Sequence, residues 1–351
     1  MRRDVGDVAA PDSIFWMADV RIAWKKELTD RMLITVSGAS GFVGQALCNE
    51  LLARGSIVRY ALRSLKPVPE SSLTDMECFA VGNIGAETDW SAALLGVDCV
   101  VHCAARAHVI HETKADVLAA YRAVNVAGTR QLAEQAVKVG VRRLVFLSSI
   151  RVHGMFTTGS RRFRRNDEPK PMEPYAISKW EAEYALHEIA ARTGLEVVIV
   201  RPPLVYGPRA KGNMARLLGL VARGLPLPFG TVDNRRSLIG LDNLVDLLIR
   251  CVEHPRAVGQ IFLASDGEDL STPELLRRIA SAMDCSARLF PVPVFLLRLA
   301  GRALGRLNEI DRLVGSLQVD SSYTREVLDW TPPVSVDEGL RKTAEWYLNR
   351  R

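Results

Sequence analysis

Tyr175 and Lys179 lie four residues apart in the sequence, and Ser149 lies upstream of them. On a helix this spacing puts a phenol and an ammonium group on the same face, one turn apart. A cation held there favours phenolate over phenol, so it lowers the pKa of a tyrosine whose ordinary value is about 10. Ser149 would add a hydrogen bond to the same reacting oxygen. The pattern predicts an acid/base site at Tyr175, although the same spacing also arises by chance on ordinary amphipathic helices.

The elements that must position these residues alternate between strands and helices. Short apolar runs predict strands, and segments with helical periodicity lie between them. We expect strands at 32–37, 57–62, 76–81, 98–104, 142–148 and 196–201, and helices at 42–54, 86–95, 115–139 and 173–193. This alternation implies an α/β fold with a doubly wound parallel sheet. Ligands of such sheets bind beyond the carboxyl ends of the strands. The glycine-rich turn at 38–44, Ser149 and the segment after Arg201 all follow predicted strands and would meet at that edge.

The rest of the chain predicts a smaller C-terminal α/β lobe, because 351 residues exceed the size at which one core usually stops growing. We assign 32–207 to a dinucleotide-binding domain and 208–351 mostly to a substrate-binding lobe, with elements of about 235–264 returning to the large sheet. Residues 1–31 form an unassigned extension. Apolar residues recur at helix-like spacing within 291–315, namely Phe295, Leu296, Leu299, Leu304 and Leu307. Packing against the smaller lobe is favoured there over a helix lying on a membrane.

Composition narrows the class of partner. A net charge of +6 and a pI near 9.1 favour an anionic partner, but no nucleic-acid motif accompanies the arginines of 161–165, which are best explained as a solvated loop. No apolar stretch reaches the ~20 residues of a membrane span. The six cysteines form no Cys-x-x-Cys pair and no ligand-like group with the six histidines, which predicts no metal site and reduced thiols in a cytoplasmic protein.

Six motifs in order resemble the extended short-chain dehydrogenase/reductase family, of the NAD-dependent epimerase/dehydratase type. They are 37–44 (SGASGFVG), 101–105 (VHCAA), 125–129 (NVAGT), 148–154 (SSIRVHG), 175–179 (YAISK) and 201–208 (RPPLVYGP). The resemblance runs from about residue 32 to residue 347. It implies a Rossmann-type sheet and catalytic roles for Ser149, Tyr175 and Lys179.

The resemblance also implies a dinucleotide on the glycine turn. Gly38 and Gly41 let backbone N–H groups approach a pyrophosphate, and Gly44 lets the following helix pack on the strand. The second strand ends in Arg63 rather than in an acid that binds a ribose 2′-hydroxyl. A guanidinium there favours NADP, although an exposed arginine beside a permissive NAD site stays open. The other implied cofactor contacts are Ser40, Phe42, Val43, Asn83, Ile84, Ala104, Ala105, Asn125, Lys179, Pro202 and Val205.

Within the family the closest resemblance is to bacterial polysaccharide-pathway enzymes that treat UDP-N-acetylhexosamines. It implies a UDP-linked sugar bound by Arg151, Asn213 and Arg236, and a homodimer. Family dehydratases place Asp-Glu directly after the catalytic Ser/Thr, whereas Ile150 and Arg151 stand here, so dehydration is disfavoured.

Three functions remain open. The sequence favours NADPH-dependent reduction of a 4-keto UDP-sugar, with Tyr175 as proton donor. A UDP-sugar 4-epimerase with a recycled NAD would use the same residues. A catalytically silent dinucleotide-binding protein is disfavoured, because Ser149, Tyr175 and Lys179 are all present.

Overall fold

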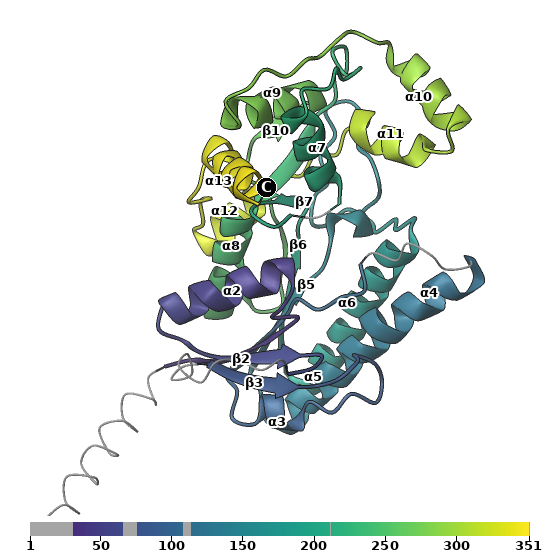
Figure 1. Ribbon diagram of the computed structural model, residues 1–351. Helices are drawn as coiled ribbons and strands as arrows, with labels where there is room; N and C mark the ends of the chain where they lie inside the picture. The colour runs from purple at the N-terminus through teal and green to yellow at the C-terminus, as the bar shows by residue number, and fades with distance from the viewer. Residues whose placement is uncertain (1–30, 66–75, 108–113, 211, 351) are drawn as a thin grey trace, which may run out of the picture.

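Seven parallel strands form the central sheet of the computed structural model, which describes residues 31–65, 76–107, 114–210 and 212–350 (Figure 1). Every neighbouring pair in this sheet is parallel. In spatial order the strands are β3 (Met76–Ala80), β2 (Ile57–Leu62), β1 (Leu33–Ser37), β4 (Cys99–His102), β5 (Arg143–Leu147), β6 (Glu196–Arg201) and β9 (Ile261–Leu263). The order reverses between β1 and β4, where a doubly wound sheet opens a crevice for ligands. The predicted Rossmann-type α/β sheet is confirmed.

Helices cover both faces of this sheet, because its strands are apolar on both sides. α2 and α8 pack on one face, whereas α3, α5 and α6 pack on the other (Figure 1). Alternation along β5 illustrates this: Val145 belongs to the first core, and Leu144 and Phe146 belong to the second. The helices of this part of the chain are α2 (Phe42–Ala53), α3 (Ser91–Leu94), α4 (Lys114–Arg122), α5 (Gly128–Lys138), α6 (Pro174–Thr193) and α8 (Leu241–Glu253).

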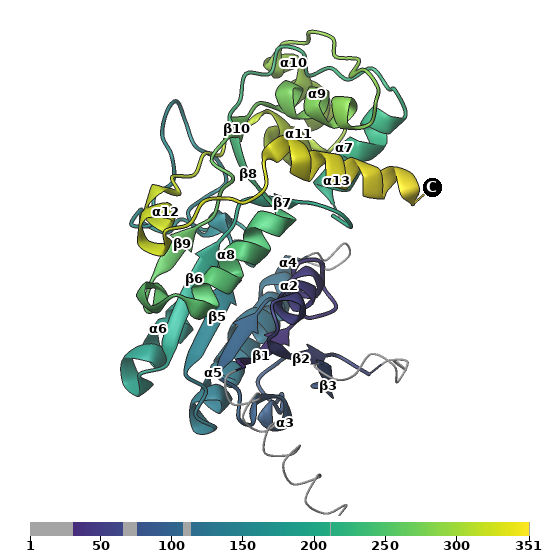
Figure 2. The ribbon, with the colours of Figure 1, turned by 90° about the vertical axis from the view of Figure 1, so that its left-hand side faces the viewer.

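A second, smaller layer of structure lies beyond the carboxyl ends of the strands (Figure 2). Its sheet has the order β10-β8-β7, with β8 parallel to β7 and antiparallel to β10. The strands are β7 (Leu204–Tyr206), β8 (Arg236–Gly240) and β10 (Asp269–Leu270). The remaining helices are α7 (Asn213–Ala222), α9 (Thr272–Ala282), α10 (Val294–Ala303), α11 (Leu307–Val314), α12 (Ser322–Leu328) and α13 (Val336–Asn349). Within 235–264, α8 packs on the large sheet and β9 extends it, whereas β8 belongs to the small sheet; the division into two domains stays a prediction.

Two expected helices differ from the structure. The helix expected at 115–139 is interrupted by a π-helical turn, η2 (Ala123–Ala127), between α4 and α5. The helix expected at 86–95 is reduced to α3, because the Thr88 hydroxyl donates to the carbonyl O of Asn83 at 3.0 Å and accepts from the amide N of Gly85 at 2.8 Å. These local side-chain bonds give the backbone an alternative to a helix.

The expected packing of the apolar residues within 291–315 is wrong for most of them. The segment forms the hairpin of α10 and α11, which closes through Leu297 and Gly301. A Cβ on Gly301 would lie 2.8 Å from Ile310, so the two helices approach closely there. Leu307 is half-buried, whereas the side chains left exposed are Phe295, Leu296, Leu299 and Leu304.

The arginine loop, the cysteines and the N-terminal extension were also subjects of sequence-based predictions. Of the arginines of 161–165, Arg161, Arg162 and Arg164 are exposed and Arg165 is partly buried. Ion pairs hold the loop on the smaller lobe: Arg162 lies 3.0 Å from Asp269, and Arg164 lies 3.5 Å from Asp320. All six cysteines are free, with Cys285 exposed. In the described chain, no helix is both long and apolar enough to cross a membrane. The predicted N-terminal extension lies outside the described residues except for Arg31.

Candidate active site

The turn between β1 and α2 packs directly against the end of β4. Gly38 has a φ of +70°, and a Cβ added there would lie 2.8 Å from the amide N of Ala104. A Cβ on Gly44 would lie 2.2 Å from the carbonyl O of Gly38, so α2 rests on the turn itself. Among the described residues, no side chain caps the start of α2, and its first turn contains no acid. The backbone N–H groups there are open to an anion, so the turn fits a pyrophosphate.

Side chains of this turn divide into exposed and buried ones. Ser40 and Gly41 are exposed. Phe42 and Val43 are partly buried and pack against the core, so they can offer a cofactor little beyond their backbone groups. Of the four predicted cofactor contacts, Ser40 and Gly41 are therefore open to a ligand, whereas Phe42 and Val43 mainly support the turn.

The predicted adenosine contacts lie beyond β2 and β3, on the same edge of the sheet as the glycine turn. Arg63 and Asn83 are exposed. Ile84 is partly buried against Gly128, where an added Cβ would lie 2.4 Å from its Cγ2. Ala105 is exposed after β4. These positions are compatible with the predicted adenosine side of a dinucleotide.

A buried hydrogen-bonded chain joins the ends of β1 and β4 to the π-helical turn. The amide N of Ala104 donates to Ser37 Oγ at 3.3 Å, and Ser37 Oγ lies 2.5 Å from His102 Nδ1. His102 Nε2 lies 3.0 Å from Thr129 Oγ1, which donates to the carbonyl O of Asn125 at 2.7 Å. Because Thr129 uses its single proton on that carbonyl, His102 donates from Nε2 and accepts at Nδ1. Burial lowers the pKa of His102 to about 3, so the ring is neutral.

Asn125 lies in the π-helical turn and holds the loop after β4 against α6. Its Nδ2 donates to Ser178 Oγ at 2.9 Å and to the carbonyl O of Arg106 at 3.1 Å, and its Oδ1 accepts from the amide N of Arg106 at 2.8 Å. Ser178 in turn donates to the carbonyl O of Tyr175 at 2.8 Å. Both amide protons are used, so Asn125 acts as a positioning residue. Single π-helical turns are common at functional sites.

Tyr175 and Lys179 both lie on α6, in unlike surroundings. Tyr175 is half-buried, with its ring edge-on to Tyr121 at 6.2 Å between centroids. Burial raises the pKa of Tyr175 to about 12, although the field of Arg151 opposes this. Lys179 is fully buried, and its Nζ lies 3.7 Å from the centroid of the Phe146 ring. Burial lowers the pKa of Lys179 to about 7.

The electrostatics differ from the sequence-based expectation. We expected Lys179 to lower the pKa of Tyr175, but the cation that acts on the phenol is Arg151. The Lys179 ammonium instead responds to Glu183, one turn further along α6, whose charge raises its pKa. The i, i+4 spacing placed the two side chains on one helical face, but it could not show how burial dominates each pKa.

The turn that carries Ser149 is fastened to α6 on both sides. Ser149 caps the short 3₁₀ helix η3 (Ile150–Val152), and its Oγ accepts from the amide N of Arg151 at 3.3 Å. Before the turn, Ser148 donates to the carboxylate of Glu183. After it, Arg151 forms an ion pair with Glu173, the residue that precedes α6. Glu173 precedes Tyr175 in the sequence and Glu183 follows Lys179. The two contacts therefore fix the position of the Ser149 turn relative to α6.

A buried ion pair lies beside this turn. The Glu183 and Arg201 side chains are 0% and 1% exposed, and Arg201 donates to both carboxylate oxygens, from Nε at 3.0 Å and from Nη2. Arg201 Nη1 also donates to His153 Nε2 at 2.7 Å. Burial, helped by the Arg201 charge, lowers the pKa of His153 to about 4. His153 therefore packs beside the site on Phe163, at 5.5 Å between ring centroids, and sequence reasoning missed the ion pair behind it.

Two arginines pair with one carboxylate near the Ser149 turn, and a third arginine lies beside them. Glu173 pairs with Arg151 and, at 2.5 Å, with Arg312 of α11. Arg236 Nη1 donates to the carbonyl O atoms of Arg312 at 2.8 Å and Gly315 at 3.0 Å. Burial and the two neighbouring arginines lower the pKa of Arg236 to about 10. Arg312 Nε is buried and has no partner among the described residues. The cluster carries an excess positive charge that suits a diphosphate.

Arg312 was not predicted, because its segment shows no motif and only the fold brings α11 to β8. The predicted Asn213 is the first residue of α7 and is half-buried. Pro202 is buried, and its carbonyl O accepts from the amide N of Ile150 at 3.0 Å, which joins β6 to the Ser149 turn. Val205 packs against the large core.

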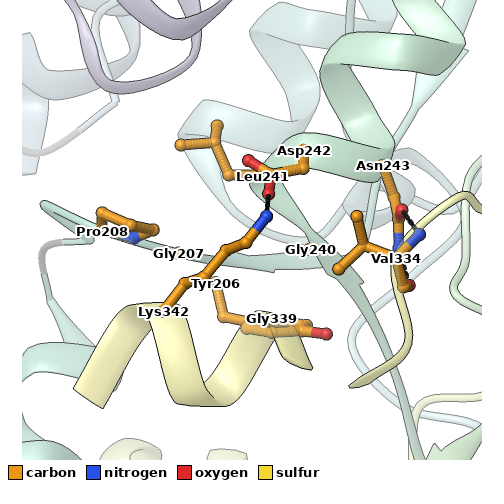
Figure 3. A pocket seen from close by; sticks show the side chains of 10 residues that line it. All are labelled: Tyr206, Gly207, Pro208, Gly240, Leu241, Asp242, Asn243, Val334, Gly339 and Lys342. Atoms are coloured by element: carbon orange, nitrogen blue, oxygen red, sulfur yellow. Dashed lines mark hydrogen bonds and ion pairs between the residues drawn. The ribbon is translucent and has the colours of Figure 1, made fainter. Parts of the chain in front are cut away.

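Figure 3 shows a small cavity of about 10 Å³ at the start of α8, which is too small for a substrate. Asp242 pairs with Lys342 at 2.7 Å, and Asn243 exchanges two hydrogen bonds with the backbone of Val334 (Figure 3). Tyr206 is buried there, and its hydroxyl donates to Asp266 at 2.8 Å. This part of the predicted substrate-binding lobe has a structural role, because its hydrogen bonds and ion pair hold α13 against the start of α8.

Comparisons with known proteins agree with this architecture. The model of the NAD dependent epimerase/dehydratase family matches residues 34–264. A UDP-glucose 4-epimerase of Vibrio cholerae is 44% identical over 317 residues, which cover 90% of this chain and 95% of that protein. The chain therefore belongs to the NAD-dependent epimerase/dehydratase family, as its motifs indicated.

More distant proteins share the same length and fold. An N-acetyl-alpha-D-glucosaminyl-diphospho-ditrans,octacis-undecaprenol 4-epimerase of Escherichia coli O157:H7 is 27% identical over 335 residues, covering 91% of this chain and 96% of that protein. The crystal structure of UDP-glucuronic acid 4-epimerase from Bacillus cereus with UDP-glucuronic acid and NAD has a TM-score of 0.73 at 22% identity, covering 91% of this chain and all of that one. At this level of sequence identity, the similarity to the Bacillus cereus structure shows a shared fold.

Proposed function

We propose that this protein is a nucleotide-sugar 4-epimerase that recycles a bound NAD. The observation that carries the proposal is the fastening of the Ser149 turn to α6 at Glu173 and Glu183, on either side of Tyr175 and Lys179. It keeps a hydroxyl, a phenol and an ammonium group on neighbouring, rigid elements. The activity of the Vibrio cholerae relative supports the epimerase over the reductase that the sequence alone favoured.

Tyr175 would move the proton at the 4-hydroxyl of the sugar. Its raised pKa makes the phenol a proton donor at neutral pH, and proton removal needs a cation nearby. The Arg151 charge already lowers the pKa of Tyr175. Lys179 would be partly protonated at neutral pH, because its pKa is about 7, and could supply a second positive charge. Ser149 would donate a hydrogen bond to the oxygen on which negative charge develops.

The residues present fit a dinucleotide. Gly38 and Gly41 keep side chains away from the uncapped start of α2, whose backbone N–H groups would bind the pyrophosphate, and Gly44 lets α2 pack on the turn. Lys179 would contact the nicotinamide ribose. When bound, NAD would accept a hydride from carbon four of the sugar and return it to the opposite face. In this proposal Arg63 is the exposed arginine beside a permissive NAD site, rather than a 2′-phosphate ligand.

The substrate class follows from the arginine cluster. Arg236 and the unpredicted Arg312 would bind the diphosphate of a UDP-hexose or UDP-N-acetylhexosamine, because guanidinium groups match phosphate oxygens in geometry and charge. Arg151, held by Glu173, would lie between the diphosphate and Tyr175. The homodimer implied by the family resemblance stays a prediction, which light scattering would test.

The test is incubation of the purified protein with UDP-glucose or UDP-N-acetylglucosamine and no added cofactor, followed by NMR. We expect interconversion at carbon four, and we expect Tyr175→Phe to lose at least about a hundredfold in rate while its nucleotide content is unchanged. Tyr184→Phe is the matched control, because Tyr184 is an exposed tyrosine of the same helix. Turnover only with NADPH and a 4-keto sugar would instead identify a reductase.

A further inference from the structure

The outer side of α10 is an apolar surface that no described element covers. Leu297 and Gly301 are buried, and Gly301 packs against Leu307 and Ile310 of α11. Phe295 and Leu299, which are 68% and 62% exposed, lie on the opposite side of the helix, and Leu304, the residue that follows α10, is 73% exposed. Figure 1 shows α10 at the outer edge of the small lobe. Single exposed apolar side chains are common on protein surfaces, but several of them grouped together usually mark an interaction site.

The charges along α10 and the residues next to it in the sequence have one sign. Residues 285–306 contain four arginines and no aspartate or glutamate. Arg298 pairs with Asp311 of α11 at 2.8 Å, whereas Arg302 and Arg306 form no ion pair with any described residue. Both of these arginines are exposed, one within α10 and one just after it. The apolar surface is therefore flanked by positive charge that the described protein does not neutralise.

The apolar surface continues into a groove of about 720 Å³ at the base of the hairpin. Phe295 and Leu299 of α10, Leu307 and Val314 of α11, and Phe156 of the loop after η3 contribute to its lining. A Cβ on Gly315 would lie 2.5 Å from the Phe156 ring, so the loop and the hairpin are in direct contact. The exposed apolar area thus extends beyond a single helix.

We propose that α10, with Phe295, Leu299, Leu304, Arg302 and Arg306, docks on a bilayer that contains anionic lipids. Aromatic and aliphatic side chains would enter the interface while the arginines meet the headgroups, as in helices that lie in the membrane plane. A second copy of the chain fits less well, because a two-fold contact would bring the same unpaired arginines of both copies together. This inference is independent of the proposed function and concerns where the enzyme works.

Sedimentation of the full chain with vesicles tests the proposal. We expect at least about tenfold stronger binding to mixed phosphatidylcholine and phosphatidylglycerol vesicles than to phosphatidylcholine alone. The double variant Phe295→Ser, Leu299→Ser should lose at least about tenfold in vesicle binding. Its rate on a soluble UDP-sugar should equal that of the wild type. Leu95→Ser is the matched control, because Leu95 is 69% exposed and lies at the end of α3, in the other lobe.

Hydrogen exchange on the wild-type chain keeps the test independent of how the variants fold. Anionic vesicles should protect the amides of α10 and leave those of α3 unchanged. The proposal is overturned if the wild type binds neither vesicle, if it binds both equally, or if protection appears away from α10. It is also overturned if light scattering shows that the serine substitutions dissociate a dimer.

Discussion

Glu183→Gln should uncouple the Ser149 turn from α6 and destabilise the fold. The Arg201 guanidinium contacts both carboxylate oxygens, so a glutamine in either orientation turns an N–H group toward an N–H donor. The Arg201 charge would stay buried, with only neutral acceptors left, namely the one glutamine oxygen and the imidazole of His153. Removing one partner of a buried ion pair costs about 3–5 kcal/mol. The free energy of unfolding should fall by about that amount, measured by urea denaturation.

Turnover should fall as well, because Ser148 loses the carboxylate that fixes the start of the Ser149 turn. Misplacing one hydrogen-bond donor of this kind costs about a hundredfold in kcat. The effect should appear in kcat rather than in KM, since the arginines proposed to bind the diphosphate are untouched.

Two variants separate ion-pair loss from positioning. Glu183→Met with Arg201→Met removes both charges and should recover most of the lost stability, because buried pairs replaced by apolar residues are often neutral. Its turnover should stay low, since the turn is still released. Glu188→Gln is the matched control: Glu188 lies on the same helix and pairs with Arg130 at 2.9 Å, but it is 47% exposed, so the loss should be below about 1 kcal/mol. If Glu183→Gln and Glu188→Gln unfold at the same urea concentration, the reasoning about burial is refuted.

Three further outcomes are expected. Stability should fall between pH 6.5 and 4, because His102 and His153 have pKa values lowered to about 3 and about 4 and take up protons only on unfolding; each contributes up to about 1.4 kcal/mol per pH unit, measurable by urea denaturation across that range. Gly44→Ala should weaken NAD binding and lower stability by about 1–3 kcal/mol, since the new Cβ would lie 2.2 Å from a backbone oxygen; calorimetry and thermal melts measure both. Arg236→Met should raise the KM for a UDP-sugar at least about tenfold in steady-state kinetics.

Each of these has a matched control. His187→Gln changes an exposed histidine of α6 and should leave the pH dependence unaltered. Asn49→Ala adds no clash on the exposed side of α2 and should melt like the wild type. Arg235→Met removes the exposed neighbour of Arg236, which pairs with Glu274 at 3.2 Å, and should leave KM unchanged. Equal effects of variant and control in any pair would contradict the corresponding prediction.

Local features of the site could be recognised from the sequence, because they depend on residue type and short spacing. The glycine turn was predictable, since Gly38 and Gly44 leave no space for a side chain. The parallel strands were predictable from continuous apolar runs. The position of Tyr175 and Lys179 on one helix followed from their spacing, and the family followed from the order of the motifs.

Contacts between distant segments were decided only by the tertiary structure. No local sequence pattern announces the pairing of Glu183 with Arg201, the approach of Arg312 to Glu173, or the effect of the Arg151 charge on the pKa of Tyr175. The exposure of α10 belongs to the same class, because helical periodicity predicts an apolar side but not whether another element covers it. Spacing fixes which groups share an element, whereas burial and pairing depend on how the elements pack.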